Sequence, residues 1–194
     1  MTQPVAVAIT GGIGAGKSEA LAAFRRHGAA TVSSDEIVHH LLRRADVREA
    51  VVARLGNGVV GPDGELDRGA IGTAVFNDRE ALTWLEQLLH PLVVQEYLTW
   101  RERLAELADA PRVSVTEVPL LYEAGGESRF DKVVVITAPR QLRRARSEVA
   151  TDAREQHLIP DAEKVKRADY AYVNTGSLEE LDAFVASVMD ELAR

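Results

Sequence analysis

The sequence GGIGAGKS at residues 11–18 has the residue types and the spacing of a phosphate-binding loop. Glycines let the backbone adopt conformations in which successive N–H groups converge on one phosphate. Lys17 can hold a cation against the outer phosphates of a nucleotide, and the Ser18 hydroxyl can bind Mg²⁺, which prefers oxygen ligands. A glycine-rich turn into a helix would explain the glycines, but it would not explain the Lys-Ser pair at this spacing. The pattern therefore predicts nucleotide binding, without identifying the group that receives a phosphate.

The segments around the loop provide the context that the motif requires. An apolar run at residues 5–9 predicts a strand before the loop, and an alanine- and leucine-rich segment at 19–26 predicts a helix after it. Because further strands alternate with helical segments, we expect a three-layer α/β fold with a five-stranded, mostly parallel sheet. The other four strands are predicted at residues 29–32, 112–118, 132–137 and 170–173.

Three carboxylates lie at or after the ends of predicted strands, at the sheet edge where ligands of parallel sheets bind. Asp35 follows the second strand, and it is either a catalytic carboxylate or the N-cap of the helix predicted at 36–42. Glu117 lies near the end of the third predicted strand, and Glu123 follows that strand. Each could belong to the magnesium shell or pair with a neighbouring arginine.

A mostly helical region at residues 36–110 separates the second strand from the third and is longer than a crossover needs. It predicts a helical insertion that holds a second substrate. Within it, His90-Pro91 is expected to interrupt the chain between one helix that ends at 89 and another at 92–108, because the residue before proline avoids helical geometry.

The helix predicted at 140–149 is rich in arginine, at Arg140, Arg143, Arg144 and Arg146. Such a row is either a solvated face or a clamp on a transferring phosphoryl group. The segment 151–159 is polar and has no clear period, which is typical of a mobile flap. We therefore treat residues 140–160 as a lid region.

The overall composition excludes several classes of protein. The 194-residue chain carries a formal net charge of −7, which argues against broad nucleic-acid binding, and it has no cysteine for disulfide or thiolate chemistry. No apolar stretch is long enough to span a membrane, and the first four residues lack the features of a secretion signal. We expect a cytoplasmic protein, and we take a monomer as the default because the sequence does not determine the oligomeric state.

Taken in order along the chain, these and several shorter motifs resemble the dephospho-coenzyme A kinase family. Each short match is weak alone, but their common order and spacing cover nearly the whole chain. The motifs lie at residues 10–18, 33–35, 63–68, 75–76, 89–92, 118–123, 168–170 and 174–177.

The resemblance implies a P-loop kinase related to nucleoside-monophosphate kinases, with a CoA-binding insertion and a short lid. It implies transfer of the γ-phosphate of ATP, with Mg²⁺, to the ribose 3′-hydroxyl of dephospho-CoA, the final step of coenzyme A synthesis. The catalytic residues would be Asp35, Lys17, Arg144 and Arg146, with Arg154 as a third candidate for the lid arginine. The residues expected to bind ATP are Gly12, Ile13, Gly14, Ala15, Gly16, Lys17, Ser18, Glu19 and Asn174, with Ser18 as the metal ligand. The residues expected at the acceptor are Asp35, Leu66, Arg68, His90, Pro91, Leu120 and Glu123.

Some positions differ from the family pattern. Ser33 stands where the family has an acidic residue, Glu19 replaces the usual threonine, and the lid region is several residues short. These differences keep open a catalytically impaired nucleotide-binding paralogue, beside a kinase of another small acceptor. A GTPase is disfavoured, because no Asn-Lys-x-Asp motif is present.

Overall fold

The computed structural model describes residues 3–76, 78–146 and 158–193, and they form two compact units. The first unit contains residues 1–33 and 100–194 and holds the sheet. The second contains residues 34–99 and is helical. The helical insertion was predicted over 36–110. The second compact unit ends at Thr99, inside the long helix α5 (Arg79–Ala105), and the rest of that helix belongs to the first unit.

The sheet of the first unit has five parallel strands in the order β2-β3-β1-β4-β5, which confirms the predicted parallel α/β fold. Its three central strands are buried on both faces, as expected of strands that helices cover on each side. The register pairs Ile9 with Glu117 and Ser33 with Glu117, so the ends of three strands meet at one edge. The strands are β1 (Val5–Thr10), β2 (Ala30–Ser33), β3 (Val113–Glu117), β4 (Lys132–Thr137) and β5 (Tyr170–Val173).

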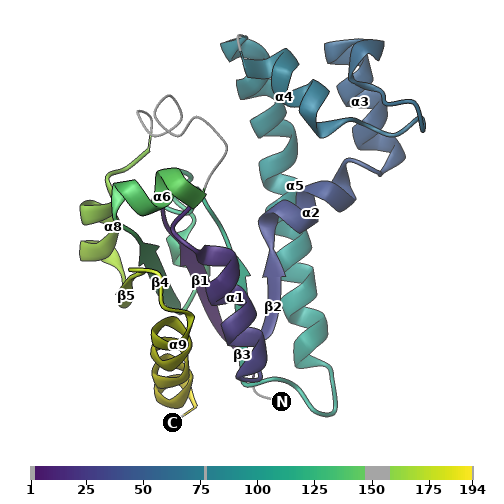
Figure 1. Cartoon of the computed structure of the whole chain (residues 1–194). Coiled ribbons are helices and arrows are strands. Elements are labelled where there is room, and N and C mark those ends of the chain that lie inside the picture. Colours follow the sequence, from purple (N-terminus) through teal and green to yellow (C-terminus); the bar gives the residue numbers. More distant parts are fainter. Residues whose placement is uncertain (1–2, 77, 147–157, 194) are drawn as a thin grey trace. The chain divides into compact units, whose positions relative to one another are not determined.

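Helices α1 (Lys17–Arg26) and α9 (Leu178–Leu192) lie side by side against one face of this sheet (Figure 1). Their apolar side chains, among them Phe24 and Val185, join Val7 and Ile136 in one buried cluster. A second cluster on the opposite face contains Leu121, Tyr122 and Val135. Phe130, Ile159 and Ala168 pack against this second cluster, and they flank η2 (Glu127–Arg129) and α8 (Asp161–Arg167) in the chain. Helix α6 (Arg140–Arg146) follows β4.

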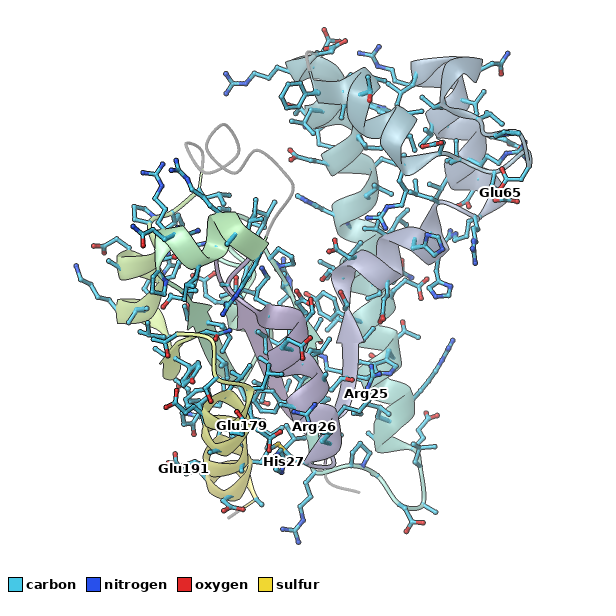
Figure 2. The ribbon with its side chains drawn as sticks, viewed as in Figure 1. Arg25, Arg26, His27, Glu65, Glu179 and Glu191 are labelled. Carbon is cyan, nitrogen blue, oxygen red and sulfur yellow. The ribbon has the colours of Figure 1, made fainter. Side chains whose placement is uncertain are left out.

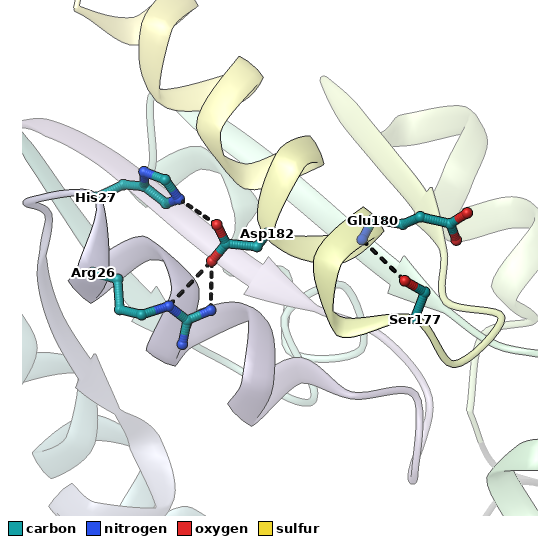
Figure 3. Close-up of polar contacts among 5 residues, drawn as sticks. All are labelled: Arg26, His27, Ser177, Glu180 and Asp182. Carbon is teal, nitrogen blue, oxygen red and sulfur yellow. Dashed lines mark hydrogen bonds and ion pairs between the residues drawn. The ribbon is translucent and has the colours of Figure 1, made fainter.

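Side-chain contacts hold α9 to the end of α1. Arg26 and His27 lie at the end of α1 (Figure 2). Asp182 accepts a hydrogen bond from Nη2 of Arg26 at 2.5 Å and contacts Nε2 of His27 at 2.9 Å (Figure 3). The sequence Ser177-Leu178-Glu179-Glu180 has the form of a capping box that opens a helix, and the structure confirms the cap: the Ser177 hydroxyl accepts the N–H of Glu180 at 3.2 Å (Figure 3).

The second unit contains α2 (Ser34–Leu41), α3 (Ala45–Leu55), η1 (Asn57–Val59), α4 (Arg68–Phe76) and most of α5 (Arg79–Ala105). Asp67 caps α4, since its Oδ1 accepts the N–H of Ala70 at 2.9 Å. In the part of the chain that the structure describes, no helix has the length and apolar character needed to cross a bilayer.

One prediction about this unit is wrong. The chain does not break at His90-Pro91, because α5 is one helix with Pro91 inside it. Pro91 removes the N–H that would bond the carbonyl of Gln87, but Pro91 is exposed, so water can reach the freed carbonyl. Apolar residues every four positions keep the helix on its core across the proline; they are Ala81, Leu85, Leu89, Val93 and Tyr97. Of the two roles considered for Asp35, the N-cap is not observed, since α2 begins one residue earlier, at Ser34.

Candidate active site

The phosphate-binding loop joins the end of β1 to the start of α1, as its sequence predicts. Gly14 and Gly16 have φ angles of 72° and 98°, which place both in the left-handed region that favours glycine. Ala15 between them is fully buried. The loop therefore has the glycine-dependent backbone of an anion site that leads into a helix N-terminus.

Neighbouring groups approach two glycines of this loop so closely that no side chain would fit at either position. A Cβ atom on Gly16 would lie 2.3 Å from Nδ2 of Asn174, and a Cβ on Gly11 would lie 1.9 Å from the carbonyl oxygen of Ile136. The loop glycines are thus required by packing as well as by backbone conformation.

Asn174 is a buried support of the loop. Its Nδ2 donates to the carbonyl of Ala15 at 3.0 Å, and its Oδ1 accepts the N–H of Gly176 at 3.1 Å. Its own N–H donates to the carbonyl of Thr137 at 2.7 Å, at the end of β4. Asn174 was predicted at the nucleotide through the family resemblance, and the structure adds a direct bond to the loop backbone that the sequence did not indicate.

Lys17 and Ser18 open α1, where the helix dipole favours an anion. The Lys17 ammonium donates to the carbonyl of Gly12 at 3.1 Å, which keeps the cation at the loop. Ser18 and Glu19 are exposed on the first turn of the helix.

The residues present fit a magnesium ion that is held largely by phosphates and water. Ser18 offers an exposed hydroxyl, and the carboxylate of Glu117 ends β3 beside β1. Among the described residues no group of three or more histidine, cysteine, aspartate or glutamate side chains could hold a metal by itself. Mg²⁺ suits such a site, because it keeps several waters and takes few protein ligands.

The arginines of α6 are not equivalent. A Cβ on Gly12 would lie 2.6 Å from Nη1 of Arg143, and a Cβ on Gly14 would lie 2.6 Å from its carbonyl oxygen, so Arg143 covers the loop with side chain and backbone. Arg144 is exposed. Arg146 lies at the other end of the site, with Nη2 3.4 Å from the position of a Cβ on Gly176. The sequence argument selected Arg144 and Arg146 and missed Arg143; Arg154 is outside the described residues.

Five of the predicted acceptor residues belong to the second unit. Asp35 is exposed in the first turn of α2, and Arg68 is exposed at the start of α4. Leu66 is half-buried beside its bridge partner Val60. His90 and Pro91 are exposed on α5.

The other two predicted acceptor residues, Leu120 and Glu123, lie in the turns after β3. Leu120 is half-buried. Glu123 Oε1 accepts the N–H of Ile159 at 3.1 Å and lies 2.8 Å from Nζ of Lys164, which is completely buried. Glu123 therefore pairs with a lysine, where an arginine had been considered. The sequence offers no signal for Lys164, since α8 has several charged residues of similar type.

Tyr122, the neighbour of Glu123 in the chain, makes a cation–π contact with Arg167. Cζ of Arg167 lies 4.2 Å from the ring centre, and the Arg167 guanidinium also forms an ion pair with Glu127. Burial is the main cause that raises the pKa of the Tyr122 hydroxyl, so this tyrosine stays neutral at physiological pH.

The family model for dephospho-CoA kinase matches residues 5–180, which includes the loop, the strands and Asn174. The chain belongs to the dephospho-CoA kinase family. The dephospho-CoA kinase of Aquifex aeolicus is 34% identical over 195 residues, which cover 97% of each chain.

Two solved structures show that the likeness extends to the whole fold of a P-loop kinase. The protein TT1252 from Thermus thermophilus superimposes with a TM-score of 0.79 at 35% identity, over 98% of this chain and 99% of the other. The dephospho-CoA kinase from Campylobacter jejuni does so with a TM-score of 0.69 at 26% identity, over 98% of each chain. The dephospho-CoA kinase family is therefore supported by sequence and by fold over nearly the full length.

Proposed function

We propose that this chain transfers the γ-phosphate of ATP to the 3′-hydroxyl of the ribose of dephospho-CoA, giving CoA and ADP. The family match over residues 5–180 is the observation that carries the proposal. The intact phosphate-binding loop, with Lys17 and Ser18 at the start of α1, supports it. The proposed enzyme works as a monomer in the cytoplasm on small-molecule substrates, without nucleic-acid or membrane partners.

The ATP site consists of the loop and its supports. Backbone N–H groups of the loop and the dipole of α1 bind the phosphates, and the Lys17 ammonium neutralises part of their charge. Ser18, with Glu117 as a second oxygen donor, would hold Mg²⁺, which supplies further charge neutralisation when it is bound. The proposed ATP-binding residues are Gly12, Ile13, Gly14, Ala15, Gly16, Lys17, Ser18, Glu19 and Asn174.

The acceptor site is proposed around Asp35, which would orient the ribose 3′-hydroxyl and take its proton as the O–P bond forms. Positioning and charge neutralisation supply most of the rate in such a transfer, so the base is secondary. The other proposed acceptor residues are Leu66, Arg68, His90, Pro91 and Leu120. Glu123, which the family resemblance also places at the acceptor, is engaged by Lys164.

Arginines of α6 complete the proposed site. Arg144 and Arg146 keep their proposed role at the transferring phosphoryl group, and Arg143 joins them because it lies against Gly12 and Gly14. A planar guanidinium suits the equatorial oxygens of that group.

The test is CoA formation from dephospho-CoA, ATP and Mg²⁺, followed by chromatography, with Asp35→Asn and Lys17→Ala beside the parent protein. We expect CoA from the parent, a fall in kcat of about 100-fold or more for Asp35→Asn because the base is lost, and a fall of similar size for Lys17→Ala because charge compensation is lost. Glu36→Gln, at the neighbouring exposed position on α2, is the matched control and should keep parent activity.

A parent protein that binds ATP but makes no CoA would contradict the proposal. ATP consumption with another small alcohol would then favour a different acceptor. Binding without any transfer would favour the catalytically impaired paralogue, for which Ser33 and Glu19 are the motivating positions.

A further inference from the structure

A fully buried lysine lies in the first unit, outside the residues that contact the loop. Lys164 of α8 places Nζ 2.8 Å from Oε1 of Glu123, and the two side chains are 1% and 15% exposed. A lysine is almost never buried to this degree unless it is paired. The pair still leaves the Nζ donors and the Glu123 Oε2 without a well-aligned hydrogen bond to the described residues.

Stability alone does not account for this pair. Two buried charges lose their hydration, and well-packed apolar residues of similar volume are often equally stable or more stable in their place. Apolar side chains already pack nearby, since Leu121 belongs to the cluster on this face of the sheet and Ile159 packs against it. What an ion pair adds is a restricted relative position of the two segments that it joins.

The Glu123 carboxylate joins the turns after β3 to the start of α8 at two points. Its Oε1 accepts the N–H of Ile159 and pairs with Lys164, so it holds both the segment just before the helix and the helix itself. The Lys164 N–H donates to the carbonyl of Pro160 within the first turn of α8. The first turn of α8 is therefore fixed relative to the end of β3.

The first turn of α8 also lies beside the phosphate-binding loop. Asp161, the first residue of α8, lies beside Gly12: a Cβ on Gly12 would be 3.3 Å from Oδ2 of Asp161 and 2.6 Å from Nη1 of Arg143. Asp161 and Lys164 are three residues apart on one helix, so they lie on neighbouring positions of its surface. A shift of α8 would consequently move Asp161 relative to Arg143 and the loop.

We propose that Lys164 is a positioning residue for phosphoryl transfer, which acts through Glu123 to hold α8 so that Asp161 and Arg143 flank the loop at Gly12. The proposal rests on the proposed function and assigns Glu123 to this ion pair instead of to direct contact with the acceptor. Lys164 is too buried to touch either substrate. Its effect should therefore appear in kcat and not in the affinity for ATP or dephospho-CoA.

The test compares the single variant Lys164→Met with the double variant Lys164→Met/Glu123→Gln. The single variant leaves a buried carboxylate unpaired, and we expect its Tm to fall by roughly 10 °C. The double variant removes both charges at nearly constant volume, so its Tm should return close to that of the parent. We expect its kcat for CoA formation to stay about tenfold lower, because small displacements of positioned groups are costly. Its KM values for both substrates should remain within about twofold of the parent.

A matched control lies on the same helix. Lys166 pairs with Glu163 at 2.7 Å, but both side chains are more than half exposed. The double variant Glu163→Gln/Lys166→Met should therefore leave Tm, kcat and KM unchanged. Parent kcat in the buried double variant with its Tm restored would overturn the positioning role.

A second variant keeps the proposal testable if the buried double variant does not fold. Glu123→Asp retains the charge but shortens the side chain, and we expect a lower kcat with an unchanged KM for dephospho-CoA. A raised KM for dephospho-CoA at parent kcat would instead mark Glu123 as an acceptor contact and overturn the proposal. A parent protein that makes no CoA overturns both this inference and the proposed function, whereas a parent that makes CoA beside a fully active double variant overturns this inference alone.

Discussion

Asn174 shows how one buried amide side chain supports a loop that consists mostly of glycine. We expect Asn174→Ala to lower the free energy of unfolding by about 1–3 kcal/mol, because the buried carbonyl of Ala15 loses its donor. The KM for ATP should also rise, since the loop loses its support. Urea unfolding and steady-state kinetics measure the two effects. Thr175→Ala, at the exposed neighbouring position, should change neither; an unchanged KM in the Asn174 variant would mean that the loop keeps its shape unaided.

Arg143 shows where residue types stop being informative. Arg140, Arg143, Arg144 and Arg146 are chemically identical and lie within two turns of α6. A helix turns about 100° per residue, so adjacent arginines face different surroundings. Only the packing of α6 against Gly12 and Gly14 distinguishes Arg143 from Arg144.

At the scale of elements, a local rule predicted a break within α5, but packing over the whole helix keeps it continuous. The residue before proline avoids helical geometry, and this rule placed a break at His90. The buried positions at every fourth residue continue through the proline, and their burial offsets the one backbone hydrogen bond that Pro91 removes. The cost is small here because the freed carbonyl lies near an exposed position.

The contact between α1 and α9 leads to a prediction about pH. The hydrogen bond from Arg26, followed by that from His27, lowers the pKa of Asp182 below 3.8 (Figure 3). The folded-state pKa is therefore below the unfolded-state value, so this carboxylate stabilises the fold above pH 3.8 and loses its contribution as the pH falls through the folded pKa. We expect Asp182→Asn to unfold at lower urea concentration than the parent at pH 7, with a difference that shrinks below pH 3.8.

The control for that experiment is Asp190→Asn on the same helix. Asp190 is exposed, and among the described residues it has no partner. Its substitution should leave the urea midpoint unchanged at both pH values. A difference between Asp182→Asn and parent that stays constant from pH 7 to pH 3 would show that the charge of Asp182 is not the source of the stabilisation.

At the scale of the whole molecule, the two compact units should respond to different ligands. The loop lies in the first unit, and five of the proposed acceptor residues lie in residues 34–99. We expect ATP alone to increase amide hydrogen-exchange protection around the loop and α1, because binding stabilises what it contacts. Dephospho-CoA should increase protection within residues 34–99. Protection by dephospho-CoA that is confined to the first unit would contradict the proposed acceptor site.

The sequence by itself determined the phosphate-binding loop, the five strands and their parallel arrangement, and the cap at Ser177. These features depend on local rules: glycine conformation, runs of β-branched residues, and hydrogen bonds between near neighbours. The family resemblance supplied the acceptor and the expected site residues. All of these were available without coordinates because the information lies within a few consecutive residues or in their order.

Only the tertiary structure decided which of several similar residues makes a specific contact. It selected Arg143 among the arginines of α6, Lys164 among the lysines of α8, and Asn174 as the support of the loop. It also carried α5 through Pro91. Each outcome depends on burial and on contacts between segments far apart in the chain. Desolvation makes a buried charge or amide require one specific partner, and no local pattern specifies that partner.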